Sequence, residues 1–242
     1  AMPSNALTDR YILVTGASRG IGRAVALEAA GRDATVIALA RTVGGLEELD
    51  DEITASGGKT VLIPADLSHE ESLARLPGAL EERFGRLDGL VLNAGLLGPL
   101  TPVADISGRE WHETLTVNLH ANLALLKLLD PLLLNSDAGR VVGVTSRAAR
   151  THKPYWGAYA ASKAAFDALV QTYASEHVET NVRANLLDPG PTATDMRANA
   201  MPGEDPSTVT PPSRIAEWVV DLLDPSTDKT AEIVAYPRPE GV

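Results

Sequence analysis

The 242-residue sequence contains no cysteine, which excludes disulfide bridges, thiol catalysis and thiolate metal sites. Its five histidines are scattered and lack the His-Glu-x-x-His spacing of zinc proteases, so we expect no metal site. No apolar run reaches the roughly 18 residues of a membrane span, and no signal-peptide pattern is present. The longest apolar stretch, 123–134, is interrupted by charged residues and predicts a buried helix. We therefore expect a cytoplasmic protein.

Positive charge is also scarce. The chain has 21 lysines and arginines against 32 acidic residues, a formal net charge of −11. Nucleic acids and anionic membranes both attract clustered cations, so neither is expected as a partner. The length suits one α/β domain over residues 1–242 with a full hydrophobic core.

Short apolar, β-branched runs alternate with helical patterns along the whole chain. Strands are predicted at 11–15, 34–39, 59–64, 88–92, 139–145, 182–187 and 231–235. Helices are predicted near 20–31, 43–56, 69–84, 108–130, 155–178 and 213–223. Strands separated by helices indicate βαβ units, so the predicted class is α/β: a doubly wound parallel β-sheet with helices on both faces.

A glycine-rich turn follows the first predicted strand. It reads Gly-Ala-Ser-Arg-Gly-Ile-Gly over 16–22 and leads directly into a helical pattern. Glycines let such a turn approach a pyrophosphate, and the following helix N-terminus attracts the anion. The turn also matches the Gly-x-Ser-x-Gly elbow of hydrolases, which needs an oxyanion loop from an earlier strand. Only about ten residues precede this strand, so the turn predicts a Rossmann-type dinucleotide site instead.

Tyr159 and Lys163 stand four residues apart in an alanine-rich helical segment. Residues at this spacing share one helix face. A fixed cation near a phenol lowers the phenol pKa, which predicts a tyrosine able to act as general acid or base near neutral pH. By itself the spacing also fits an ordinary solvated helix face.

The tip of the second predicted strand bears on the choice of cofactor. It ends at Ala40-Arg41 without the carboxylate that would bond the ribose 2′-hydroxyl of NAD. Arg41, together with Arg19 in the glycine turn, can instead bind a 2′-phosphate, whose geometry guanidinium groups match. Solvated surface arginines would leave the same pattern. We expect NADP(H) as the preferred cofactor, with NAD(H) possible.

Residues 191–213 are rich in proline and threonine and show little periodicity. Long irregular segments of compact domains are often lids, and this one follows a strand whose end should face the cofactor. We expect a substrate lid, with Met196 and Met201 as an adaptable apolar lining; a passive surface loop is the alternative.

Together these segments resemble the short-chain dehydrogenase/reductase family, over nearly the whole chain. The resemblance implies a catalytic tetrad and a set of cofactor-binding positions. The implied catalytic residues are Asn118, Ser146, Tyr159 and Lys163. The implied cofactor-binding residues are Thr15, Gly16, Ser18, Arg19, Gly20, Ile21, Gly22, Arg41, Asp66, Leu67, Asn93, Ala94, Gly95, Tyr159, Lys163, Pro189, Gly190, Thr192 and Thr194.

The resemblance also implies the roles of the tetrad. Tyr159 would exchange a proton with the substrate oxygen while hydride moves to or from the nicotinamide, and Ser146 would polarise the carbonyl. Lys163 would lower the tyrosine pKa and bind the nicotinamide ribose, and Asn118 would hold a water that relays protons to it. The chain departs from the family at Leu92, where an asparagine is frequent, and in lacking a glycine-rich C-terminal end.

The resemblance implies an NADP(H)-dependent oxidoreductase that interconverts a small-molecule carbonyl and an alcohol, assembled as a homodimer or homotetramer. An NAD-linked alcohol dehydrogenase of the same family and a non-catalytic dinucleotide-binding scaffold are the alternatives. For Asp66, a helix N-cap explains the residue nearly as well as an adenine contact. The basic segment 147–153 fits either an anionic substrate or a solvated loop.

Overall fold

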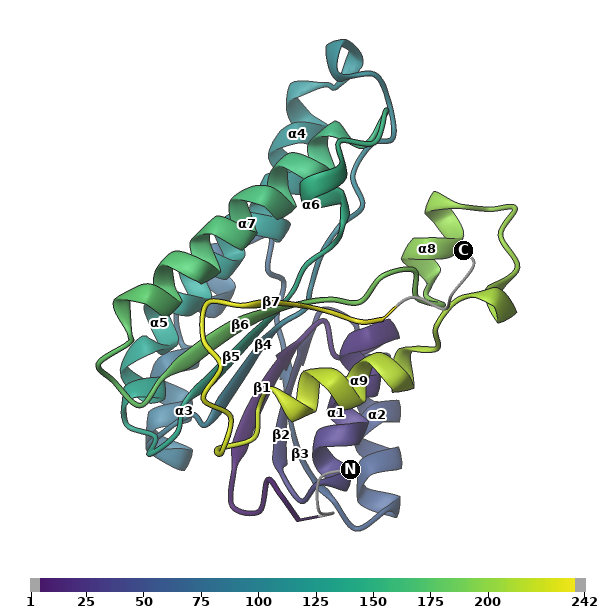
Figure 1. The fold of residues 1–242 in the computed structure, drawn as a ribbon. Helices are drawn as coiled ribbons and strands as arrows, with labels where there is room; N and C mark the ends of the chain where they lie inside the picture. The colour runs from purple at the N-terminus through teal and green to yellow at the C-terminus, as the bar shows by residue number, and fades with distance from the viewer. Residues whose placement is uncertain (1–4, 238–242) are drawn as a thin grey trace.

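The computed structural model describes residues 5–237, and its centre is one seven-stranded parallel sheet (Figure 1). The strands are ordered β3-β2-β1-β4-β5-β6-β7, so the chain starts in the middle and winds outward in both directions. Their bounds are β1 Tyr11–Thr15, β2 Thr35–Ala40, β3 Lys59–Pro64, β4 Gly89–Leu92, β5 Arg140–Val144, β6 Arg183–Asp188 and β7 Ile233–Ala235. The predicted doubly wound parallel sheet is confirmed.

Helices cover both faces of this sheet. One face carries α1 (Gly20–Gly31), α2 (Val43–Ala55) and α9 (Pro212–Asp221). The other carries α3 (Leu76–Phe84), α5 (Ala121–Leu134) and α7 (Gly157–Glu176). Four shorter elements lie at the carboxyl ends of the strands: α4 (Gly108–Leu115), a π-helical turn η3 (Thr116–His120), α6 (Ala148–Thr151) and α8 (Asp195–Ala200). Single 3₁₀ turns occur at η1 (Glu70–Leu73), η2 (Val103–Asp105) and η4 (Pro206–Thr208).

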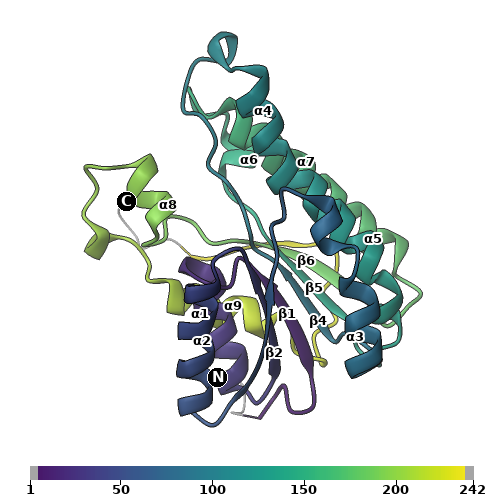
Figure 2. The same cartoon turned by 180° about the vertical axis from the view of Figure 1, so that it is seen from behind.

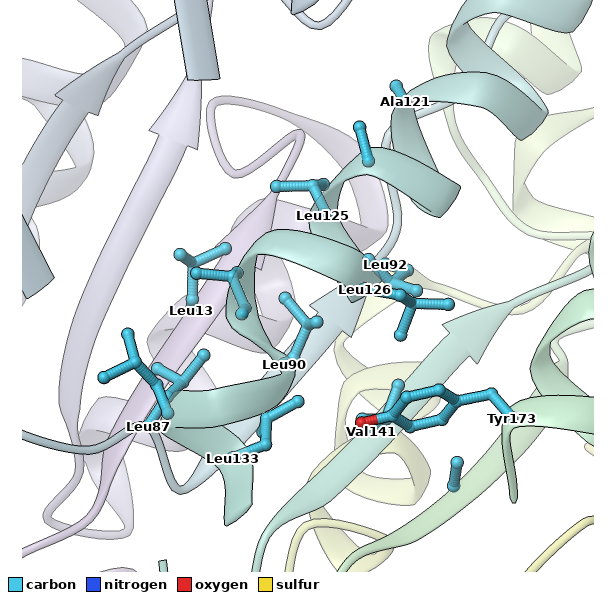
Figure 3. Packing of buried hydrophobic residues seen from close by; sticks show 14 of the residues in the cluster. Leu13, Leu87, Leu90, Leu92, Ala121, Leu125, Leu126, Leu133, Val141 and Tyr173 are labelled. Atoms are coloured by element: carbon cyan, nitrogen blue, oxygen red, sulfur yellow. The ribbon is translucent and has the colours of Figure 1, made fainter. Parts of the chain in front are cut away.

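The central strands are apolar on both sides because each side faces a helical layer. In β1, Ile12 and Val14 pack against the α1 layer, whereas Leu13 packs against the α5 layer. Figure 3 shows Leu13 and Leu90 beneath α5, whose Leu125 also joins the cluster. Burying a large aliphatic side chain is worth about 1.5–3 kcal/mol, so these two layers fix the sheet that carries the site.

Two predicted helices are divided in the structure. The segment predicted as a helix over 69–84 breaks into η1 and α3, and the one over 108–130 becomes α4, η3 and α5, ending at Leu134. The 123–134 stretch is helical as predicted, but Leu123 and Leu134 are 43 % exposed, so residues 5–237 leave these two side chains of α5 partly uncovered. By length and composition the run Gly108–Leu134 could span a membrane; half of its most apolar part is buried in the protein, as in a core helix. A homodimer or homotetramer stays a prediction.

All seven strands run parallel, so their carboxyl ends meet at one edge of the sheet. Figure 2 shows α8 on one side of this edge and α4 and α6 on the other. Ligands of open α/β sheets bind outside the carboxyl ends of the strands, where the winding direction reverses. Here the winding direction reverses between β1 and β4. The glycine turn directly follows β1, and the Asn-Ala-Gly segment directly follows β4.

Candidate active site

A cavity of about 1490 Å³ occupies the carboxyl edge of the sheet. The glycine turn and the ends of β2 and β3 line one part of it, and α6, the start of α7 and the segment 188–201 line the other. Nearly all predicted site residues face it. Thr15, Gly22 and Asn118 are the exceptions; they lie behind its wall.

The glycine turn brings the backbone very close to the end of β4. Gly16 and Gly20 have φ of +62° and +56°, a region that disfavours side chains. A Cβ on Gly22 would lie 2.2 Å from the Gly16 carbonyl oxygen and 2.4 Å from Asn93 Nδ2, so the turn has no room for one. The glycines therefore let the turn pack closely against the end of β4 at the cavity wall.

Thr15 and Asn93 hold the turn in place. The backbone N–H groups of Asn93 and Ala94 both donate to Thr15 Oγ1 at 3.0 Å. Asn93 Nδ2 in turn donates to the Thr15 carbonyl oxygen at 3.1 Å. These bonds join the ends of β1 and β4, which explains why a buried threonine and an asparagine stand at these two positions.

Arg19 and Arg41 line the cavity with exposed side chains. Within residues 5–237, neither guanidinium forms an ion pair with a carboxylate or donates a side-chain hydrogen bond. Their charges are thus open to a ligand, as the sequence predicted for a 2′-phosphate site. Both sit close to the exit of β2, on the same part of the cavity wall as Asp66.

Asp66 lies in a turn after β3 rather than at a helix N-cap. Its Oδ1 accepts from the Ser68 backbone N–H at 2.9 Å and from Ser68 Oγ at 2.7 Å. These bonds to Ser68, with smaller contributions from His69 and Arg41, hold the pKa of the Asp66 carboxyl below its usual range. The residue before the next helical turn is His69, so the capping alternative is wrong. Asp66 lines the cavity as an ionised side chain.

Tyr159 and Lys163 share one face of α7 and point into the cavity beneath Ser146. Both side chains are buried, and Lys163 Nζ lies 5.8 Å from the centre of the Tyr159 ring. Lys163 Nζ donates to the carbonyl oxygen of Val144 at 3.0 Å, which ties it to the end of β5. Ser146 follows on the same loop, close enough to Tyr159 for its hydroxyl to act on the pKa of the phenol. The end of β5 and α7 thus bring a hydroxyl, a phenol and an amine together.

The pKa values in this structure differ from the expectation that Lys163 lowers that of Tyr159. Burial raises the pKa of Tyr159 to about 12. Ser146 acts to lower this pKa, and the charge of Asp188 acts to raise it. Burial lowers the pKa of Lys163 to about 8, with Asp167 acting to raise it. The expected lowering of the tyrosine pKa is therefore wrong for this structure, because burial is the largest effect on it and acts to raise it. Tyr159 is a neutral phenol at neutral pH.

Asn118 is completely buried in the π-helical turn η3. Its Oδ1 accepts from the Leu96 N–H at 2.7 Å, and its Nδ2 donates to the Leu96 carbonyl at 2.8 Å and to Ser162 Oγ at 3.0 Å. The side chain thereby fixes the loop after β4 against α7. A Cβ on Gly95 would lie 3.4 Å from Asn118 Oδ1 and 3.6 Å from Lys163 Nζ, so these groups converge on one point. A role in relaying protons stays a prediction.

The segment 191–213 is more ordered than its composition indicated. Thr192 and Thr210 form a parallel bridge that closes its base, and Arg197 binds Glu204 through Nε and Nη2 at 2.6 and 2.7 Å. Thr194 Oγ1 accepts from the Arg197 N–H and caps α8, a helix that the sequence reading missed. The Thr194 side chain also packs against the glycine turn, since a Cβ on Gly20 would lie 3.5 Å from it. Contact of Thr194 with the cofactor stays a prediction.

Several cavity residues were not predicted as site residues. Leu96, Leu97 and Trp156 line it, and the Trp156 ring packs edge-on against Tyr159 with 5.8 Å between the ring centres. Their position could have been inferred from the motifs, because two follow the Asn-Ala-Gly segment and the third precedes Tyr159 by three residues. Asp188, buried at the end of β6, was also missed as a neighbour of the tyrosine.

Comparison with known proteins agrees with this geometry. The family model for short chain dehydrogenase matches residues 10–205. The uncharacterised oxidoreductase YciK of Escherichia coli K12 is 39 % identical over 228 residues, covering 93 % of this chain and 90 % of its own length. A short chain dehydrogenase of Escherichia coli CFT073, crystallised with NADPH, superposes with a TM-score of 0.91 at 38 % identity, covering 97 % of this chain and 99 % of its own.

A short chain dehydrogenase of Shigella flexneri 2a strain 301, crystallised with NADP, is similar to the same degree. Its TM-score is 0.90 at 37 % identity, covering 96 % of this chain and 99 % of its own. The family match spans most of the chain and includes both the glycine turn and the Tyr159–Lys163 pair. This chain belongs to the short-chain dehydrogenase family of oxidoreductases.

Proposed function

We propose that this protein is an NADP(H)-dependent carbonyl reductase in which Tyr159 protonates the substrate oxygen. The observation that carries the proposal is the convergence of Ser146, Tyr159 and Lys163 at one end of a cavity. Its other end presents a glycine turn and two arginines that have no carboxylate partner within residues 5–237. NADP(H) bound there would supply or accept the hydride. The NADP and NADPH complexes of two similar proteins support the same cofactor.

The residues present fit this cofactor. Gly16 and Gly22 leave no Cβ in the space next to the end of β4, as close approach of a pyrophosphate requires. The guanidinium groups of Arg19 and Arg41 are open on the same wall, and β2 ends in Ala40 instead of a carboxylate. A carboxylate at that position would repel a 2′-phosphate, whereas two free guanidinium groups attract it.

The protonation states suit the carbonyl-reducing direction. At neutral pH, Tyr159 holds its proton, so it can donate to an oxygen on which negative charge develops. Lys163, with a pKa of about 8, is largely a cation at neutral pH and stabilises the phenolate that this donation leaves. Ser146 donates a second hydrogen bond to the same oxygen. For alcohol oxidation the phenol would first have to lose a proton that burial holds in place.

The cavity beside Tyr159 points to a substrate with an apolar body. Leu96, Leu97 and Trp156 line one side of it, and Met196 and Met201 of the segment 191–213 line the other. We infer that 191–213 is a lid over this pocket. Methionine side chains adapt to ligands of varied shape, which suits a broad range of aldehydes and ketones.

A direct assay tests the proposal. Purified protein is mixed with NADPH or NADH and a panel of aliphatic and aromatic aldehydes and ketones, and loss of the reduced nicotinamide absorbance is followed. We expect turnover with NADPH for at least one carbonyl. Turnover of an alcohol with NAD alone would instead favour the dehydrogenase alternative, and cofactor binding without turnover of any compound would favour the non-catalytic scaffold.

A further inference from the structure

Arg150, on α6, makes two ion pairs directly behind the candidate active site. Its Nη1 lies 2.6 Å from Asp167 Oδ2, and its Nη2 lies 2.5 Å from Asp188 Oδ2. Asp167 stands one helical turn after Lys163 on α7, and Asp188 is the last residue of β6. The two carboxylates are almost completely buried, with 9 % and 7 % of their side chains exposed. One guanidinium therefore joins three separate elements around the cavity.

Each carboxylate also holds a second part of the site. Asp167 accepts a hydrogen bond from the Thr145 hydroxyl, and Thr145 stands between Val144, which binds Lys163, and Ser146. Asp188 Oδ1 accepts from the Gly190 N–H at 3.2 Å, where the chain leaves the sheet toward 191–213. Movement of either carboxylate would thus be transmitted to the catalytic loop or to the base of the lid.

The charges of these groups act on the catalytic pair. Tyr159 faces Ser146, Lys163 and Asp188, and the Asp188 charge raises the pKa of the phenol. Lys163 faces Asp167, whose charge raises the pKa of the amine. Arg150 is the cation paired with both carboxylates, so its removal would leave two buried negative charges beside the catalytic pair without that partner.

We propose that Arg150 is a positioning residue for carbonyl reduction: by bridging Asp167 on α7 and Asp188 at the end of β6, it holds Tyr159 and Lys163 in place and offsets the negative charge beside them. The proposal rests on the proposed function, because it concerns the same reaction. It also means that Arg150 is already paired, so among the basic residues of 147–153 it is not free for an anionic substrate.

Substitution of Arg150 tests this. In Arg150→Met the uncompensated carboxylates should raise the pKa values of Tyr159 and Lys163, so activity on the alkaline side should be lost at a pH about one unit higher. We expect kcat to fall about tenfold, because the catalytic groups are less well placed, with the Kd for NADPH nearly unchanged. Adding Asp188→Asn to Arg150→Met should move the alkaline limb back toward that of the wild type.

Arg10 offers a matched control at the opposite edge of the sheet. It also binds two carboxylates, those of Asp88 and Asp137, and Asp88 is buried. Arg10→Met should lower the melting temperature without moving the pH profile. An equal shift of the alkaline limb in Arg10→Met and Arg150→Met would overturn the proposal, since the effect would then be global.

Arg150→Lys decides the matter if Arg150→Met does not fold. A lysine keeps the charge but cannot bind two carboxylates with the fixed fork of a guanidinium, so we expect the wild-type pH profile with a kcat lowered several-fold. Wild-type kcat and pH profile in every Arg150 variant that folds would refute the positioning role. Failure of the proposed function looks different, because the wild-type protein itself would then reduce no carbonyl.

Discussion

Replacement of Arg41 by alanine should lower the affinity for NADPH much more than that for NADH. Arg41 lines the cavity at the exit of β2, and its guanidinium is exposed and without an ion-pair partner within residues 5–237. NADPH and NADH differ only by the 2′-phosphate. A contact of Arg41 with this phosphate therefore contributes to the binding of NADPH alone, and its loss should leave the binding of NADH unchanged.

The size of the effect follows from the environment. A hydrogen bond to a charged group is worth about 1.5–3 kcal/mol, and solvent exposure places Arg41 at or below the lower end of that range. A free-energy change of about 1.4 kcal/mol corresponds to roughly tenfold in Kd. We therefore expect the Kd for NADPH to rise about tenfold in Arg41→Ala, and further in the Arg19→Ala, Arg41→Ala double variant.

Calorimetric titration of both cofactors measures this, with the Kd for NADH as internal control. The preference for NADPH should also decline as salt is added, because the pairing is exposed and therefore screened. Equal Kd values of the wild-type protein for NADH and NADPH would refute the assignment. So would an Arg41→Ala variant that loses affinity for both cofactors to the same extent, since that would indicate damage to the site in general.

Three further predictions concern the turn, the buried lysine and the lid. Gly22→Ala places a Cβ against the Gly16 carbonyl and Asn93. It should lower the free energy of unfolding, measured with denaturant, by about 1–3 kcal/mol and abolish NADPH binding. Binding of NADPH at the wild-type Kd would contradict the claim that the turn has no room for a Cβ at this position. Burial lowers the pKa of Lys163 from 10.5 to about 8, so between these values the folded state binds fewer protons than the unfolded one. The free energy of unfolding of the cofactor-free protein should therefore rise with pH from about 8 to 10, above which the raised pKa of Tyr159 acts in the opposite direction. Lys163→Met should remove this rise and be more stable than the wild type at pH 7 by up to roughly 3 kcal/mol; an unchanged pH dependence would show that another group is responsible. Thr194→Val removes the cap of α8, which should speed hydrogen exchange over 195–200 and raise KM while lowering kcat for the carbonyl; unchanged exchange and kinetics would mean that 191–213 is not a lid.

The sequence was most informative where one local rule decided the structure. The alternation of apolar runs and helical patterns located all seven strands to within two residues at each end. For the five buried strands, β1, β2, β4, β5 and β6, the reason is that strands covered on both faces are largely apolar. The glycine turn and the Tyr159–Lys163 pair lie in one cavity as expected, since parallel strands deliver their following loops to one edge.

The rest depended on contacts between distant residues. The bridge of Arg150 to Asp167 and Asp188 joins positions 17 and 38 residues away, and no local pattern marks it. The raised pKa of Tyr159 likewise comes mainly from burial, which the i, i+4 spacing of Tyr159 and Lys163 does not reveal. The short helix α8 lies in a segment with weak hydrophobic periodicity. The π-helical turn η3 lies inside a longer helical pattern that continues through it. Neither element could therefore be located from the periodicity.

Replacement of Tyr159 by phenylalanine tests the central claim most directly, because it removes one hydroxyl and keeps the buried ring. We predict that Tyr159→Phe binds NADPH with nearly the wild-type Kd and melts close to the wild-type temperature, yet loses carbonyl reduction by about two to four orders of magnitude, the usual contribution of a general acid. A Tyr159→Phe variant that reduces the same carbonyl at the wild-type rate would contradict the account.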